Sequence, residues 1–121
     1  MSRGLKIAVT AVGTLLGLWF VLAGSQKFLS RAAFEGMFAD FGLPLWSVPV
    51  TGILELAGAV LVLIPRTAMY GATVILTVMV GATACHLLTG AGSPAGAIVA
   101  LLMAAFVAGV RFRAARSSHD L

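Results

Sequence analysis

The chain has 121 residues, of which 60% are hydrophobic and only 10% are charged, and its mean hydropathy is +1.07. A soluble domain carries roughly a quarter charged residues, so this composition excludes an ordinary water-facing surface and predicts one domain, residues 1–121, embedded in a lipid bilayer. The net charge of +4 does not indicate a nucleic-acid partner, because the basic residues stand at the ends of apolar stretches, and the lone Cys85 excludes an internal disulfide or a Cys-x-x-Cys redox or zinc pair.

The first apolar stretch runs from Ile7 to Gly24 and is followed by polar residues. A membrane span needs about 20 apolar residues, so we expect the first transmembrane helix over residues 7–27. Because Arg3 and Lys6 precede the stretch, it also resembles a cleavable signal peptide. The stretch is long for the apolar core of such a peptide, and Ser25 stands where a lipoprotein would need cysteine, so a retained helix is favoured.

The segment between the first and second apolar stretches has the pattern of a short amphipathic helix. Arg31 and Glu35 stand four residues apart, as in a helical ion pair, and Gly42 and Pro44 end the pattern. We expect this helix to lie on the outer membrane surface or to be tucked over the bundle, and we favour an interfacial connector over a substrate lid. Its apolar face comprises Phe34, Met37, Phe38 and Phe41.

Three more apolar stretches follow, and each ends at a recognisable stop signal. They predict transmembrane helices at about residues 46–64, 68–88 and 94–111. Pro65 and Arg66 end the second span, and a glycine-rich turn ends the third. The predicted fold is therefore an all-α membrane protein, a four-transmembrane-helix bundle with a short amphipathic interfacial helix between its first and second helices.

Small residues recur at helical spacing on every predicted span. In lipid, such rows let helix backbones approach closely, so they predict a close-packing face on each helix, with the lone cysteine as one more packing residue. The rows are Gly13 and Gly17; Gly52, Gly58 and Ala59; Thr77, Gly81 and Cys85; and Gly96, Ala100, Ala104 and Ala108.

Lysine and arginine are unevenly divided between the two sides of the predicted bundle. Lys27 and Arg31 are the only ones on the side of the amphipathic helix. By the positive-inside rule, we expect the chain in the inner (cell) membrane with both termini in the cytoplasm. The cytoplasmic side would carry Arg3, Lys6, Arg66, Arg111, Arg113 and Arg116.

Glu55 lies midway along the second predicted span, about 14 Å from either end. A carboxylate at this depth costs a few kcal/mol, so it should face the bundle interior, be paired, or stay protonated. Counting residues from the span ends puts Thr77 at the same level and Gly17 near it. A ligand or proton site and a polar clasp between helices explain Glu55 equally well.

His86 is expected near the outer surface, at a height similar to Lys27 and Gln26. These three residues would form the rim of a polar funnel with Glu55 at its floor, and a contact between His86 and Glu55 would need a tilted helix or a bridging water. The candidate polar pocket thus comprises Glu55, His86, Lys27, Gln26 and Thr77. One histidine and one carboxylate fall short of a metal site, and an interfacial histidine is more often a hydrogen-bonding partner than a proton carrier.

Several short motifs follow one another along nearly the whole chain. They are Ala23-Gly24-Ser25-Gln26-Lys27-Phe28, Phe41-Gly42-Leu43-Pro44, Gly52-Ile53-Leu54-Glu55-Leu56-Ala57-Gly58, Leu63-Ile64-Pro65-Arg66, Gly71-Ala72, and Val78-Met79-Val80-Gly81-Ala82 leading to His86. Each motif alone is unspecific, but in this order and spacing they resemble the DoxX-like family of small four-helix membrane proteins.

That family takes its name from membrane subunits associated with quinone-linked oxidation of sulfur compounds, and the resemblance singles out Lys27, Glu55 and His86. It implies an accessory subunit of a quinone- or sulfur-linked membrane redox assembly, with other redox subunits as partners and quinone as the cofactor to test. A non-enzymatic assembly or chaperone factor is the alternative, and a small transporter or proton conduit ranks last. The chain lacks a complete catalytic or cofactor motif, so we do not expect an enzyme acting alone, and a homo-oligomer is left open.

Overall fold

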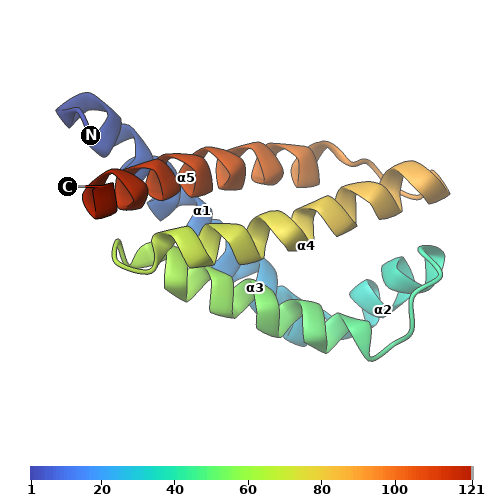
Figure 1. Ribbon diagram of the computed structural model, residues 1–121. Helices are drawn as coiled ribbons and strands as arrows, with labels where there is room; N and C mark the ends of the chain where they lie inside the picture. The colour runs from blue at the N-terminus through green and yellow to red at the C-terminus, as the bar shows by residue number, and fades with distance from the viewer. Residues whose placement is uncertain (121) are drawn as a thin grey trace.

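The computed structural model describes residues 1–120, with side chains up to residue 117, and every regular element in this part is an α-helix. The predicted all-α class is confirmed. Figure 1 shows both ends of the chain and the turn after α3 at one end of the bundle, which we call the terminal end, and α2 at the other, the α2 end. The helices are α1 (Arg3–Leu29), α2 (Arg31–Asp40), α3 (Ser47–Leu63), α4 (Ala68–Thr89) and α5 (Ala95–Asp120).

The helix boundaries follow from local chemistry. The Ser2 hydroxyl accepts a hydrogen bond from the Leu5 N–H at 3.2 Å and caps the start of α1. Ser30 alone separates α1 from α2. At the end of α4, Gly90 has a φ of 70°, the left-handed conformation that glycine adopts without a Cβ clash, and its N–H donates to the His86 carbonyl at 2.9 Å. The chain after α4 therefore turns back directly beside His86.

The four long helices pack in a ring. α1 contacts α3 and α5, and α4 contacts the same two helices from the other side. Their outer surfaces carry large apolar side chains, such as Leu18 and Leu102, that are more than half exposed. Such a surface suits lipid, since these apolar side chains have no group that hydrogen-bonds to water. The fully buried large apolar side chains of the core are Val9, Leu16, Val48, Ile75 and Val107.

Three helices of the described chain are long and apolar enough to cross a membrane: α1, α4 and residues 95–117 of α5. α3 is equally apolar but has only 17 residues, which is shorter than the other three. α1 and α5 extend past the predicted ranges 7–27 and 94–111, because their basic flanks consist of residues that favour helix, chiefly arginine, lysine and alanine.

Two pairs of glycines bring the helix backbones together. A Cβ on Gly52 of α3 would lie 3.3 Å from the Gly24 carbonyl oxygen of α1, and a Cβ on Gly24 would lie 3.0 Å from the Gly52 carbonyl oxygen. α3 and α4 meet in the same way, because a Cβ on Gly71 would overlap the backbone of Gly58. The predicted close-packing roles of Gly52 and Gly58 are therefore confirmed, and these contacts fix where α3 crosses each neighbour.

The small-residue row on α4 does not pack a helix, and the predicted packing face there is wrong. A Cβ on Gly81 would meet no atom within 4 Å, whereas Thr77 and Cys85 line a cavity together with it. The reason is visible in Figure 1, where α3 and α4 lie close at the terminal end and diverge toward the α2 end. The row thus faces space instead of a backbone.

We predict that Gly71→Ala destabilises the protein by about 1–3 kcal/mol, because the added methyl group must push two helix backbones apart. Gly81→Ala is the matched control, since it lies on the same helix in open space and gains the same helix propensity. Thermal or denaturant unfolding in detergent measures both. Equal stability of the two variants would contradict the glycine crossing between α3 and α4.

Candidate functional site

A cavity of about 420 Å³ lies between the diverging ends of α3 and α4 and beneath α2. Most of its lining is apolar, with Met37 and Phe38 from α2, Leu54 from α3, and Met79 from α4. Its polar lining comes from α1, α3 and α4 and comprises Lys27, Thr51, Glu55, Thr77, Cys85 and His86. Four of the five residues of the predicted pocket, namely Lys27, Glu55, Thr77 and His86, are therefore neighbours around one space.

Lys27 and Glu55 form a buried ion pair at the floor of this cavity. The Lys27 Nζ lies 2.6 Å from the Glu55 Oε1, and the residues are 8% and 2% exposed. The separation is within hydrogen-bonding distance for an ammonium group and a carboxylate, and Oε1 has no other partner. Two opposite charges this close cancel at a distance, so the cavity has no net charge although it holds two charged groups.

The antiparallel packing of α1 and α3 explains how these two side chains meet. Gly24 and Gly52 lie level, so Lys27 stands one turn toward the α2 end and Glu55 one turn toward the terminal end, about 9 Å apart along the axis. In a helix, each Cα–Cβ bond tilts toward the N-terminus. Lys27 therefore leans toward the terminal end and Glu55 toward the α2 end, and the side chains converge.

This pairing was not predicted, because heights counted from the ends of apolar stretches ignore the register between helices. That count put Lys27 on the rim, well above Glu55, and put Gly17 near the level of Glu55. In the structure a Cβ on Gly17 would meet Val62 and Leu63, about two turns farther along α3 than Glu55. The glycine crossing slides α1 along α3 by this amount and brings Lys27 down to Glu55.

α2 covers the cavity with the apolar face that its sequence predicts. Phe38 is only 6% exposed, and the Lys27 Nζ lies 4.6 Å from the centre of the Phe34 ring, a cation–π distance. On the outer side of α2, the predicted ion pair is confirmed, with the Arg31 Nε 3.1 Å from the Glu35 Oε1. α2 therefore contributes a wall of the cavity and a second partner for the buried ammonium group.

His86 is held by the turn that follows α4 and not by Glu55. Its Nδ1 lies 2.7 Å from the Ala91 carbonyl oxygen, and its ring packs against that of Phe41 in a T-shaped arrangement with the centroids 4.9 Å apart and the planes at 82°. A carbonyl oxygen only accepts, so Nδ1 carries a proton, and in the neutral form of the ring Nε2 is then the acceptor. A Cβ on Gly92 would lie 3.2 Å from the ring, so glycine there lets the turn close over the imidazole.

Gln26 and Thr77 differ in their relation to the cavity. Gln26 is not on its lining, and its Oε1 accepts from the Ser30 hydroxyl at 2.9 Å, at the junction of α1 and α2. Thr77 lines the cavity, and its hydroxyl donates to the Thr73 carbonyl at 2.9 Å. The described residues contain no cluster of three or more His, Cys, Asp or Glu side chains arranged to hold a metal ion.

Thr51 and Cys85 also line the cavity but were not among the predicted site residues. A sequence signal exists for Thr51, which stands one turn before Glu55 on the same helix face. For Cys85 the four-residue spacing from Gly81 was interpreted as packing, and only the divergence of α3 and α4 shows otherwise.

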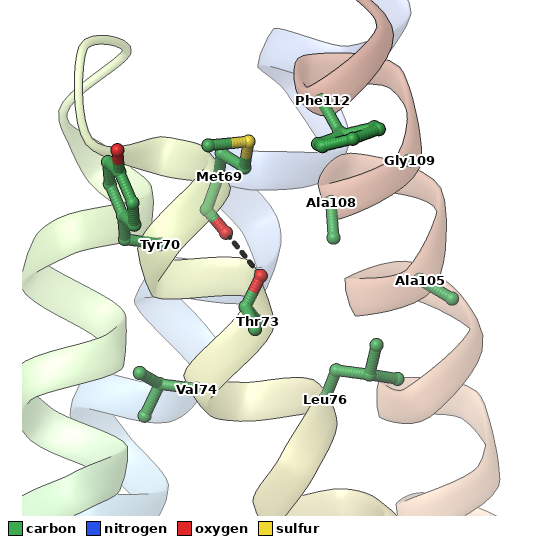
Figure 2. Close-up of a pocket in the computed structure, with 9 residues that line it drawn as sticks. All are labelled: Met69, Tyr70, Thr73, Val74, Leu76, Ala105, Ala108, Gly109 and Phe112. Carbon is green, nitrogen blue, oxygen red and sulfur yellow. Dashed lines mark hydrogen bonds between the residues drawn. The ribbon is translucent and has the colours of Figure 1, made fainter.

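A second hollow, of about 670 Å³, lies between α4 and α5 toward the terminal end. Figure 2 shows Met69, Thr73 and Leu76 of α4 on one side and Ala105 and Phe112 of α5 on the other. Its threonine hydroxyl donates to the carbonyl of residue 69 at 2.7 Å. Its lining contains no charged residue, so the cavity beneath α2 is the better candidate for chemistry.

The model described as the DoxX-like family matches residues 11–110, which include every polar residue of the cavity. No curated protein and no solved structure matches the chain.

We predict that Lys27→Met and Glu55→Gln each destabilise the protein by about 3–5 kcal/mol, because each leaves a buried polar group without its partner. The double variant should lose much less than the sum of the two single losses. The exposed pair on α2 is the control, since Arg31→Met and Glu35→Gln should each cost less than about 1 kcal/mol. Additive losses for Lys27 and Glu55 in a double-mutant cycle would show that the pair does not act as a unit.

Proposed function

Because the chain belongs to the DoxX-like family, we propose that it is an accessory subunit of a membrane redox assembly, quinone- or sulfur-linked, that holds a quinone ring in the cavity beneath α2. The observation that carries the proposal is the Lys27–Glu55 ion pair, buried at the floor of an otherwise apolar cavity. A purely structural clasp needs no space beside it, whereas this pair has a ligand-sized space next to it.

The proposed membrane arrangement has four spans. α3 packs along both α1 and α4, which are long enough to cross a bilayer, so it lies at the same depth as they do. Its 17 residues cover about 26 Å, and a hydrocarbon core of about 30 Å can adapt to a short helix by local thinning. α2 then lies at the membrane surface, over the α2 end of the bundle.

The orientation follows from the same arrangement. An even number of spans puts both termini on one side, and Figure 1 places them together at the terminal end. Arg3, Lys6 and Arg66 lie in or next to the segments at that end. The positive-inside rule therefore favours an inner-membrane protein with its terminal end in the cytoplasm.

The shape and lining of the cavity suit a lipophilic ring. Its volume lies within the range of about 300–1,000 Å³ that is usual for small-molecule sites. Leu54, Thr77 and Gly81 line the cavity and are each exposed, which supports a cavity that opens sideways between α3 and α4. A ligand dissolved in the bilayer could enter there without crossing water.

A bound quinone would accept electrons and protons in the reaction that partner subunits carry out. The chain itself contributes binding and orientation: apolar side chains on both sides of the ring and polar groups at its edges. This division of roles agrees with the lack of a catalytic motif in the sequence.

The arrangement predicts opposite labelling of two single cysteines in a Cys85→Ala background. Ser93→Cys, in the turn at the α2 end, should react with a membrane-impermeant maleimide in spheroplasts. Ser117→Cys, at the terminal end, should react only after the membrane is permeabilised. The reverse pattern would contradict the orientation, and labelling of both before permeabilisation would show that α5 does not cross the membrane.

For the function itself, we predict that mild extraction from native membranes retains quinone or a redox subunit, detectable by mass spectrometry. Gly81→Leu should lose the quinone, because it fills the cavity and leaves the ion pair intact, and Glu55→Gln should also lose it. Glu35→Gln is the matched control on the outside of α2 and should retain it.

If wild type and Gly81→Leu emerge with the same companions and no quinone, the redox role is wrong. In that case a non-enzymatic assembly factor, recognised through outer surfaces that this substitution does not touch, would be the better explanation.

A further inference from the structure

The threonine hydroxyls and the Nδ1–H of the imidazole at the cavity all donate hydrogen bonds to carbonyl groups of the protein itself. The Thr51 hydroxyl donates to the Ser47 carbonyl at 2.7 Å, and the Thr77 hydroxyl donates to the Thr73 carbonyl at 2.9 Å. The Nδ1 proton of His86 is donated to the turn after α4. What these three side chains offer to a ligand is therefore lone pairs: two hydroxyl oxygens and one imidazole Nε2.

The charged groups do not reverse this balance. Glu55 is an acceptor, and the ammonium group of Lys27 is the strong side-chain donor on the lining. The carboxylate and the face of Phe34 engage two of its three N–H groups, which leaves one for a ligand. Cys85 adds only a weak thiol donor. The lining thus presents mainly acceptors, and because its two charges cancel, it favours a neutral ligand over an anion.

From this lining we propose that the cavity selects the reduced, hydroxyl-bearing form of its ligand, a quinol, over the oxidised quinone; the inference rests on the proposed function. A quinol has two O–H donors that can reach lone pairs of the lining. A quinone has only carbonyl acceptors, so it would leave these lone pairs without partners in an apolar site, and an unsatisfied buried polar group is costly.

The geometry points to His86 as the residue that sets this preference. Its tautomer is fixed by the Ala91 carbonyl, and the close approach of Gly92 and Phe41 holds the ring in place. An imidazole held in this way cannot turn to offer a proton to a quinone carbonyl. The two threonine hydroxyls can rotate and donate to a quinone if they give up the hydrogen bonds to carbonyls of their own helices. They therefore discriminate less between quinol and quinone.

The test compares three ligands on the purified full chain in lipid nanodiscs, under anaerobic conditions. They are a short-chain ubiquinol, the corresponding ubiquinone, and the dimethyl ether of the quinol, which keeps the ring and tail but has no O–H group. We expect the quinol to bind about tenfold more tightly than either of the others.

Two variants locate the preference. His86→Phe keeps an aromatic ring against Phe41 but removes Nε2, so the ratio of dissociation constants should fall to about two. Phe41→Leu removes the ring contact and leaves Nε2, so it should retain most of the preference. A His86→Phe protein with the full tenfold preference would overturn the assignment to this residue.

The outcomes for the wild type separate this inference from the function on which it rests. If quinone binds as tightly as quinol or more tightly, and Gly81→Leu abolishes binding of both, the preference is wrong and the quinone site stands. If none of the three ligands binds, the proposed function itself fails.

Discussion

The buried ion pair between Lys27 and Glu55 is the constraint on which the rest of the structure depends. An unpaired carboxylate halfway along an apolar helix is costly to bury, and so is an unpaired ammonium group at the same depth. Each charge needs the other, which requires α1 and α3 to meet in one register. The Gly24–Gly52 crossing, one turn from both residues, provides that register because no Cβ keeps the backbones apart. The ion pair and the glycines are thus two parts of one arrangement, since a shift of α1 along α3 would separate the charges.

The second glycine crossing explains why there is space next to the ion pair. α3 and α4 touch through Gly58 and Gly71 near the terminal end, and from that contact they diverge. Two straight helices that diverge from a contact near one end leave a gap at the other, and α2 covers this gap with Phe38. The amphipathic helix is therefore needed for more than connection. Without it the Lys27 ammonium group would lose the ring of Phe34 and would be exposed at the open end of the cavity.

The sequence predicted the helices better than it predicted their contacts. Apolar stretches and the stop signals at Gly42, Pro65 and the turn after α4 predicted the order of the helices, since these signals act within one helix. The partner of Glu55 could not be found in this way, because a height counted along one helix says nothing of the tilt or register of its neighbour. The same limit applies to the row at Thr77, Gly81 and Cys85. Small residues at four-residue spacing indicate a surface without bulk, and only the neighbouring helix decides whether a backbone or a cavity fills the space.

The acceptor character of the cavity has the same physical origin as its fold. In an apolar environment without water, a threonine hydroxyl on a helix satisfies its proton most easily at the carbonyl four residues earlier, and both Thr51 and Thr77 do so. A hydroxyl that donates its proton in this way has only its oxygen lone pairs left for a ligand in the cavity. His86 is different, because its proton is bound by a turn that Gly90 and Gly92 shape through their positive φ angles. The threonines therefore give the cavity a general bias toward donors, whereas the turn after α4 gives one fixed acceptor, and discrimination between two forms of the same ring requires the fixed one.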